Sequence, residues 1–220
     1  MSYLLSVYIM YYNMFIYLTF HICVCGLSLY VYMMGTASAI EQFRLWLQKN
    51  ESTTSDAAVI LAKHQHIAAV AEQLRSIQTL SSLRPSDRAI IYLGATFTAN
   101  SIAQNDVANH HDILAALAPR GSDIQQRQLI AAMEWFCAVR EEDLLRMFPV
   151  VLKQLYDADL IDEDAFFSWH ADTIRNEYSA DSSLITDEQL VALREAATPF
   201  ITWLREAEEE ESSEEGDEDA

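Results

Sequence analysis

The sequence has few of the residues that interrupt helices or cross-link a chain. Its 220 residues include only five glycines, four prolines and three cysteines. So few glycines and prolines provide few of the tight turns that a β-rich topology needs, and this favours helices. The cysteines form no Cys-x-x-Cys pair, so they indicate neither a disulfide framework nor a structural zinc site. We therefore predict no metal ion and no other cofactor.

The sequence also lacks the motifs of the common catalytic sites. It contains no phosphate-binding loop, no dinucleotide-binding glycine pattern, no nucleophile elbow and no His-Glu-x-x-His motif. The histidines are poor ligand pairs. His64 and His66 are two residues apart on an expected helix, and His110 and His111 are adjacent, so each pair points to different sides. We predict that the chain is not an enzyme.

Basic residues are scarce in the carboxyl-terminal part of the chain. Residues 141–220 contain 24 acidic and five basic side chains, a difference that equals the formal net charge of −19 for the whole chain. In residues 1–140, nine acidic and nine basic side chains cancel. An acidic field of this kind repels phosphate groups and attracts basic segments, with screening over ~8 Å at physiological salt. We expect a basic protein partner and no direct contact with nucleic acid.

The amino-terminal segment, residues 1–35, is strongly apolar. The 32 residues from Tyr3 to Met34 include no Asp, Glu, Lys or Arg, and about 20 apolar residues suffice to span a bilayer. The run is too long for a secretory signal and has no basic residues before it. Two interpretations remain open: a single-pass membrane anchor, or a translated upstream region that precedes a true start at Met33 or Met34.

Residues 36–208 are typical of one helical domain. Capping boxes begin at Ser38, Ser122 and Thr186, and Ser86 is a further candidate N-cap. Apolar residues recur at helical spacing, and the segments expected to be helical start at Ser38, follow Ser86, and cover about 56–80, 106–117, 124–139, 141–156, 162–178 and 186–208.

Short connections join these segments, and no alternating strand pattern is present. They predict an all-α fold of stacked antiparallel helical hairpins, like a HEAT or armadillo solenoid. Pro149 lies inside one helical segment and predicts a kink or break there, and Pro199 is expected to bend the last helix. Ten of the fifteen residues from Glu206 to Ala220 are acidic, so we expect residues 209–220 to form a disordered acidic tail.

Two segments combine aromatic and acidic residues, Leu155–Trp169 and Pro199–Glu211. Carboxylates attract lysine side chains, exposed aromatic faces hold ammonium groups by cation–π contacts of ~0.5–2 kcal/mol each, and the lysine stems lie along apolar surface. Several such contacts together are multivalent. The alternative for each aromatic side chain is ordinary packing in the core, with the acids as a solvated face.

At these segments the chain resembles the two-tryptophan (W-two) HEAT-type domains of eukaryotic translation initiation factors, in particular the carboxyl-terminal domain of factor 5. The family's two aromatic/acidic boxes match Tyr156–Trp169 and Pro199–Glu211. The likeness continues through Gln126–Phe136 and, more weakly, back to about Ile40.

The resemblance implies a cytoplasmic adaptor that binds the lysine-rich segment of the initiation factor 2 beta subunit and contacts initiation factors 1 and 3. Carried over by motif, the partner-binding residues belong to the first box (Tyr156, Asp157, Asp159, Asp162, Glu163, Asp164 and Trp169) and to the second box (Trp203, Glu206, Glu208, Glu209, Glu210 and Glu211).

The resemblance leaves alternatives for the function. The epsilon subunit of initiation factor 2B uses the same boxes in a guanine-nucleotide exchange domain, and factor-5-mimic proteins use them as regulators. The zinc ribbon of the GTPase-activating domain of factor 5 has no counterpart here, so we expect that activity to be absent. With the resemblance taken into account, we favour a start at Met33 or Met34 over a membrane anchor.

Overall fold

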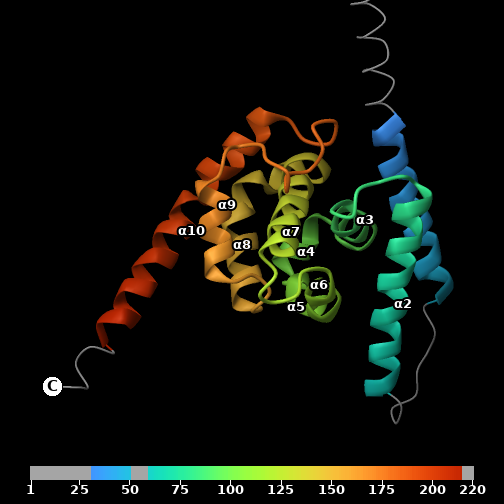
Figure 1. The fold of residues 1–220 in the computed structure, drawn as a ribbon, viewed down its shortest axis with the longest axis horizontal. Helices are drawn as coiled ribbons and strands as arrows, with labels where there is room; N and C mark the ends of the chain where they lie inside the picture. Colours follow the sequence, from blue (N-terminus) through green and yellow to red (C-terminus); the bar gives the residue numbers. More distant parts are fainter. Residues whose placement is uncertain (1–30, 51–58, 215–220) are drawn as a thin grey trace, which may run out of the picture.

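The computed structural model describes residues 31–50 and 59–214, and in these ranges it is helical with no β-strand (Figure 1). The expected all-α fold is confirmed. After a helix of residues 31–50, the elements are α2 (Val59–Leu80), α3 (Asp87–Thr96), α4 (Ala99–Ala103), α5 (Asp106–Asn109), α6 (His111–Leu117), α7 (Asp123–Trp135), a π-helix η2 (Phe136–Arg140), a 3₁₀ helix η3 (Glu142–Met147), α8 (Phe148–Asp157), α9 (Glu163–Ala171) and α10 (Asp187–Glu214).

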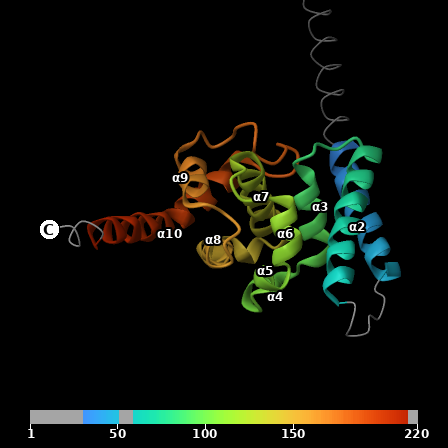
Figure 2. The ribbon, with the colours of Figure 1, turned by 60° about the horizontal axis from the view of Figure 1, so that its bottom comes forward.

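The helices are stacked in chain order. The helix of residues 31–50 and α2 stand side by side at one end, α3 and α7 lie in the middle, and α8, α9 and α10 form the other end (Figures 1 and 2). Contacts between α2 and α3, α3 and α7, α7 and α9, and α8 and α10 connect successive layers. Each layer buries its apolar face on the next, as in a helical-repeat solenoid.

One continuous core runs through this stack, from Phe43 near the amino-terminal end to Leu204 on α10. The packing is close where the helix of residues 31–50 meets α3. A Cβ atom added to Gly94 would lie 2.7 Å from Cδ1 of Ile40 and 3.1 Å from Cη2 of Trp135. The absence of a side chain at Gly94 therefore allows the two helices to approach each other.

Some predicted helix starts are wrong. Ser38 lies inside a helix that already includes residue 31, so it cannot be the N-cap. Before Ser38, this helix is attached to α3 by a hydrogen bond from the hydroxyl of Tyr32 to the carboxylate of Asp87. Ser86 and Ser122 precede α3 and α7, but neither side chain caps its helix. Near the start of α3 it is Asp87 that accepts a hydrogen bond from the backbone N–H of Arg84, at 2.8 Å.

The segment expected as one helix at 106–117 is divided at His110, where the hydroxyl of Tyr92 lies 2.6 Å from Nδ1 of the imidazole. The helix expected at 162–178 ends at Ala171. Beyond it, Arg175 donates hydrogen bonds to the carbonyl oxygens of Ala180 and Ile185, at 2.9 and 2.8 Å. In both places a side chain makes contacts that the hydrophobic periodicity of the sequence does not indicate.

Other predictions of local structure are confirmed. The chain changes from η3 to α8 at Met147–Phe148, and Pro149 stands in the first turn of α8. Backbone N–H groups in the first turn have no acceptor within the helix, so a proline there costs no hydrogen bond. Thr186 and Gln189 form the expected capping box: the N–H of Thr186 donates to Oε1 of Gln189 at 3.0 Å, and the N–H of Gln189 donates to Oγ1 of Thr186 at 3.3 Å.

Two expectations concern the ends of the chain. In the described ranges no helix is both long and apolar enough to cross a bilayer, and the uncharged segment at residues 3–34 lies almost entirely outside those ranges. Helix α10 includes Pro199 and continues to Glu214, six residues beyond the domain end predicted at residue 208. Glutamate is a good helix former, so the helical backbone extends into the acidic run. Residues 215–220 lie outside the description.

Candidate functional site

The two aromatic/acidic boxes come together in space because α8 packs against α10. The first box covers the end of α8, the turn after it and α9, and the second lies on α10. Figure 1 shows α8 and α9 beside the first part of α10, whose last turns extend beyond the other helices.

An aromatic contact joins the two boxes. The rings of Tyr156 and Trp203 meet edge to face, with centroids 5.7 Å apart, and Phe200 lies beside Trp203 at 5.9 Å. The hydroxyl of Tyr156 donates to Oε1 of Glu163 at 2.9 Å, which connects α8 to α9. Trp203 is 41% exposed. Its ring is therefore packed against Tyr156 and Phe200 and remains partly exposed.

Trp169 is placed differently from the prediction. It is only 3% exposed, and its Nε1 donates to Oε1 of Glu134 at 3.0 Å. The guanidinium of Arg194 lies 4.5 Å from its ring centroid. Because α9 packs against both α7 and α10, this side chain points into the core. A partner cannot reach the buried ring, so the expected direct contact by Trp169 is wrong. Its contacts with Glu134 and Arg194 instead join helices within the core.

Two acids of the first box hold the turn between α8 and α9. Arg120 forms ion pairs with Asp159 and Asp162. Asp162 also accepts hydrogen bonds from Nε2 of Gln126, at 2.7 Å, and from the N–H of Gly121, at 3.0 Å. These hydrogen bonds, that of Gln126 foremost, keep the pKa of Asp162 below its ordinary value. Asp162 thus anchors α9 to the start of α7.

All five acids of the first box line one surface pocket, together with Arg120, Tyr156 and Ile161. Asp164 is an exposed residue of this pocket. Glu206, on α10, is also exposed but does not line the pocket. Glu208, Glu209, Glu210 and Glu211 belong to the helical backbone of α10, and their side chains lie outside the description. The structure therefore brings the described acids of the first box together, and it places the later glutamates on the helix that carries Trp203.

An apolar groove runs beside this pocket, between α8 and α10. Asp157 lines both hollows, and the groove is otherwise lined by Pro149, Val150, Lys153, Gln154, Pro199, Phe200 and Trp203. The two hollows therefore meet at a carboxylate. An extended chain of basic and apolar character could place charged groups in the pocket and aliphatic groups in the groove.

The sequence interpretation missed two features of this region. Lys153 lies in the groove, with its Nζ 4.8 Å from the ring centroid of Trp203 and 2.8 Å from Oδ1 of Asp157. The four-residue spacing from Lys153 to Asp157 on one helix was the signal for that ion pair. The other feature is the buried pair of Glu134 and Arg194, in which Nε of Arg194 lies 3.7 Å from Oε1 of Glu134. No local pattern in the sequence indicates this pair.

Burial changes the ionisation of that pair. Glu134 is 2% exposed, and burial raises its pKa to about 7, although Arg194 and the indole N–H of Trp169 oppose the change. Burial also lowers the pKa of Arg194. In residues 31–50 and 59–214 no group of histidine, cysteine, aspartate and glutamate has an arrangement suited to a metal ion. The pair joins helices; it does not resemble an acid/base site open to a substrate.

Comparisons with known proteins agree with this geometry. Residues 125–214, which include both boxes, match the W2 family described as eIF4-gamma/eIF5/eIF2-epsilon. Eukaryotic translation initiation factor 5 of Zea mays is 31% identical over 149 residues, which are 67% of this chain and 29% of that protein. The mouse factor 5 (Mus musculus) is 39% identical over 84 residues, 38% of this chain and 18% of that protein. The chain thus spans less than a third of these relatives.

A solved structure has the same fold. The structure described as the C-terminal domain of translation initiation factor 5 at low pH matches with a TM-score of 0.55 and 23% identity, over 80% of this chain and 96% of that one. The expected HEAT-type solenoid is therefore confirmed. Residues 125–214 thus match the W2 family described as eIF4-gamma/eIF5/eIF2-epsilon, and the chain is similar to translation initiation factor 5.

Proposed function

We propose that this chain is a non-catalytic, cytoplasmic adaptor of translation initiation that binds a lysine-rich protein segment, that of the initiation factor 2 beta subunit. The observation that carries the proposal is that the acidic pocket meets the groove at Asp157, beside the partly exposed ring of Trp203. Initiation factors 1 and 3 are further proposed partners, by the likeness to factor 5.

The surface matches the chemistry of a lysine-rich segment. Lysine is a compact cation on a four-carbon stem, so its ammonium group fits the carboxylates of the pocket and its stem fits the apolar wall formed by Val150, Pro199 and Phe200. One exposed ion pair contributes only ~0–1 kcal/mol. Several lysines on one segment contact the surface at the same time, so the affinity of the whole segment exceeds that of any single lysine.

The experiment is a calorimetric titration of the full chain with a peptide of ten lysines at 0.1 M salt. We expect Trp203→Ala to weaken binding about tenfold, because the cation–π contact and one apolar side chain of the groove are lost. Asp164→Lys should weaken it by at least about threefold. Glu72→Lys has the same change of charge on α2, at the other end of the stack, and serves as the matched control with a smaller effect.

Salt gives the opposing outcome. Exposed charges are screened over ~3 Å at 1 M salt, so binding should then be largely lost. A complex that persists at 1 M salt, or that responds equally to Asp164→Lys and Glu72→Lys, would exclude the acidic pocket as the binding surface.

The matched family description also includes eIF2-epsilon, so nucleotide exchange is the second candidate function. Both relatives described above are factors 5, which favours the adaptor. A GDP-release assay on initiation factor 2 separates the two: acceleration by the purified chain would favour the exchange domain.

A further inference from the structure

Lys153 makes, within the chain, the two contacts that the proposed function assigns to a lysine of the partner. Its ammonium nitrogen lies 4.8 Å from the ring centroid of Trp203 and 2.8 Å from the carboxylate of Asp157. Both residues line the groove between α8 and α10, and Asp157 also lines the acidic pocket. An internal cation therefore lies at the junction of the two hollows.

The position of Lys153 follows from the helix rather than from the core. It lies one helical turn before Asp157 on α8 and three residues before Tyr156, so its side chain reaches across the groove to α10. The side chain is 51% exposed, and no buried group depends on it in the contacts described. A residue of this kind can leave its position without disturbing the packing of the helices.

We propose that Lys153 is an internal competitor of the partner's lysines: it covers Trp203 and neutralises Asp157 in the free protein, and it is displaced when a basic segment binds. The proposal rests on the proposed function of the groove and pocket. Its consequence is a lower affinity, because only the fraction of molecules in which Lys153 has moved away offers the complete site. The contact would also disfavour weak, isolated cations while a run of lysines still displaces it.

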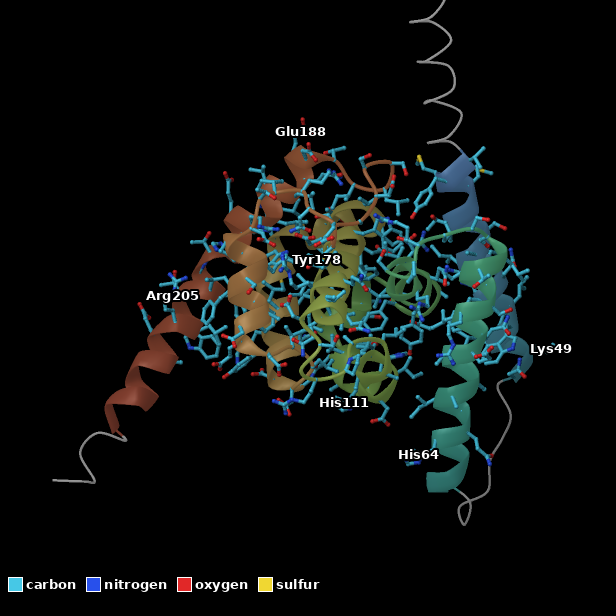
Figure 3. The ribbon with its side chains drawn as sticks, in the orientation of Figure 1. Lys49, His64, His111, Tyr178, Glu188 and Arg205 are labelled. Carbon is cyan, nitrogen blue, oxygen red and sulfur yellow. The ribbon has the colours of Figure 1, made fainter. Side chains whose placement is uncertain are left out.

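The test is the same titration with the ten-lysine peptide on the full chain. Lys153→Met keeps the length and the apolar stem but removes the charge, so we expect binding to tighten about fivefold. Arg205→Met is the matched control. Arg205 is exposed on α10, two residues after Trp203 (Figure 3), and its loss changes the net charge equally. We expect it to tighten binding less than about twofold, by general electrostatics.

A second pair of variants tests the position of the contact. On a Trp203→Ala background at 50 mM salt, the remaining carboxylates still attract the peptide over a longer screening distance. There Lys153→Met should tighten binding more than Arg205→Met by a smaller factor than with Trp203 present, because only the ion pair with Asp157 is left to compete. Thermal unfolding followed by circular dichroism should be unchanged by Lys153→Met, since the residue is exposed.

The outcomes separate the two proposals. Equal effects of Lys153→Met and Arg205→Met on binding, or an advantage of Lys153→Met that is undiminished without the ring of Trp203, would overturn the internal competitor while the proposed function stands. Weaker binding by Lys153→Met would make this lysine a support of the site and would also overturn it. No binding of the peptide by the wild type or by Lys153→Met would overturn both.

Discussion

Trp169 and Trp203 stand in boxes of similar composition but in different surroundings. The indole N–H of Trp169 is paired with the buried carboxylate of Glu134, and its ring is covered by Arg194. Trp203 packs on Tyr156 and remains 41% exposed. The first tryptophan thus contributes to stability, and the second provides the contact face of the candidate site.

Substitution of the two tryptophans should lower the free energy of unfolding by different amounts. Trp169→Ala removes a large buried ring and one hydrogen-bond donor to the buried carboxylate of Glu134, so we expect a loss of about 3–5 kcal/mol in the free energy of unfolding. Trp203→Ala should cost about 1 kcal/mol, because the ring is only partly buried. Urea unfolding measures both. Similar losses for the two variants would contradict the distinction.

At the scale of elements, helix starts that look alike in sequence are not equivalent. Ser122 and Thr186 both begin capping-box patterns in the sequence. Thr186 exchanges hydrogen bonds with Gln189, three residues later, whereas the side chain of Ser122 makes no capping hydrogen bond. Gln189 also donates from its Nε2 to the carbonyl oxygen of Ala138, at 2.9 Å. The start of α10 is therefore fixed both locally and against the π-helix η2.

Removing the two hydroxyls should reveal this difference. Thr186→Ala should lower the free energy of unfolding by about 1 kcal/mol, since the first turn of α10 loses its cap. Ser122→Ala, which removes no side-chain cap, should change it by less than about 0.5 kcal/mol. Guanidinium denaturation of the full chain compares them. A larger loss for Ser122→Ala would contradict the capping geometry.

At the scale of the whole molecule, the buried pair Glu134 and Arg194 connects three helices. Glu134 lies on α7, Arg194 on α10, and Trp169 of α9 binds the same carboxylate. Arg194 also donates to the carbonyl oxygens of His170 and Asp172, at 3.4 and 3.2 Å, at the end of α9. The layer that carries the candidate site is thereby attached to the middle of the stack.

This cluster predicts a pH dependence of stability. The pKa of Glu134 rises from 4.5 to about 7 on folding, so the folded protein binds the proton more tightly than the unfolded chain. Its contribution is fully present below about pH 4 and is lost as the pH rises through about 7. Relative to Glu134→Gln, which does not titrate, the wild type should lose stability between pH 5 and pH 8.

Urea unfolding at several pH values measures that difference. The exposed Glu195 on the same helix as Arg194 gives the control: Glu195→Gln should differ from the wild type by an amount that does not change between pH 5 and pH 8. A constant difference for Glu134→Gln as well would show that the buried carboxyl does not take up its proton in this range.

Local patterns in the sequence were sufficient for the helical class, the break near Pro149, the cap at Thr186 and the concentration of acidic charge in the last 80 residues. Periodicity, proline geometry and net charge depend on neighbouring residues or on composition, so they can be read without a fold. The division at His110 coincides instead with a contact to Tyr92, and the helix end at Ala171 with a hydrogen bond from Arg194 to the carbonyl oxygen of Asp172. Both partners lie elsewhere in the chain.

The roles of the box residues also required the tertiary structure. Trp169 becomes buried because Glu134, 35 residues earlier, and Arg194, 25 residues later, meet it in the core. Asp162 becomes an anchor because the turn at Arg120 and Gly121 is brought against it. Which side of a helix faces a neighbour depends on the packing of distant segments, and no local pattern of aromatic and acidic residues contains that information.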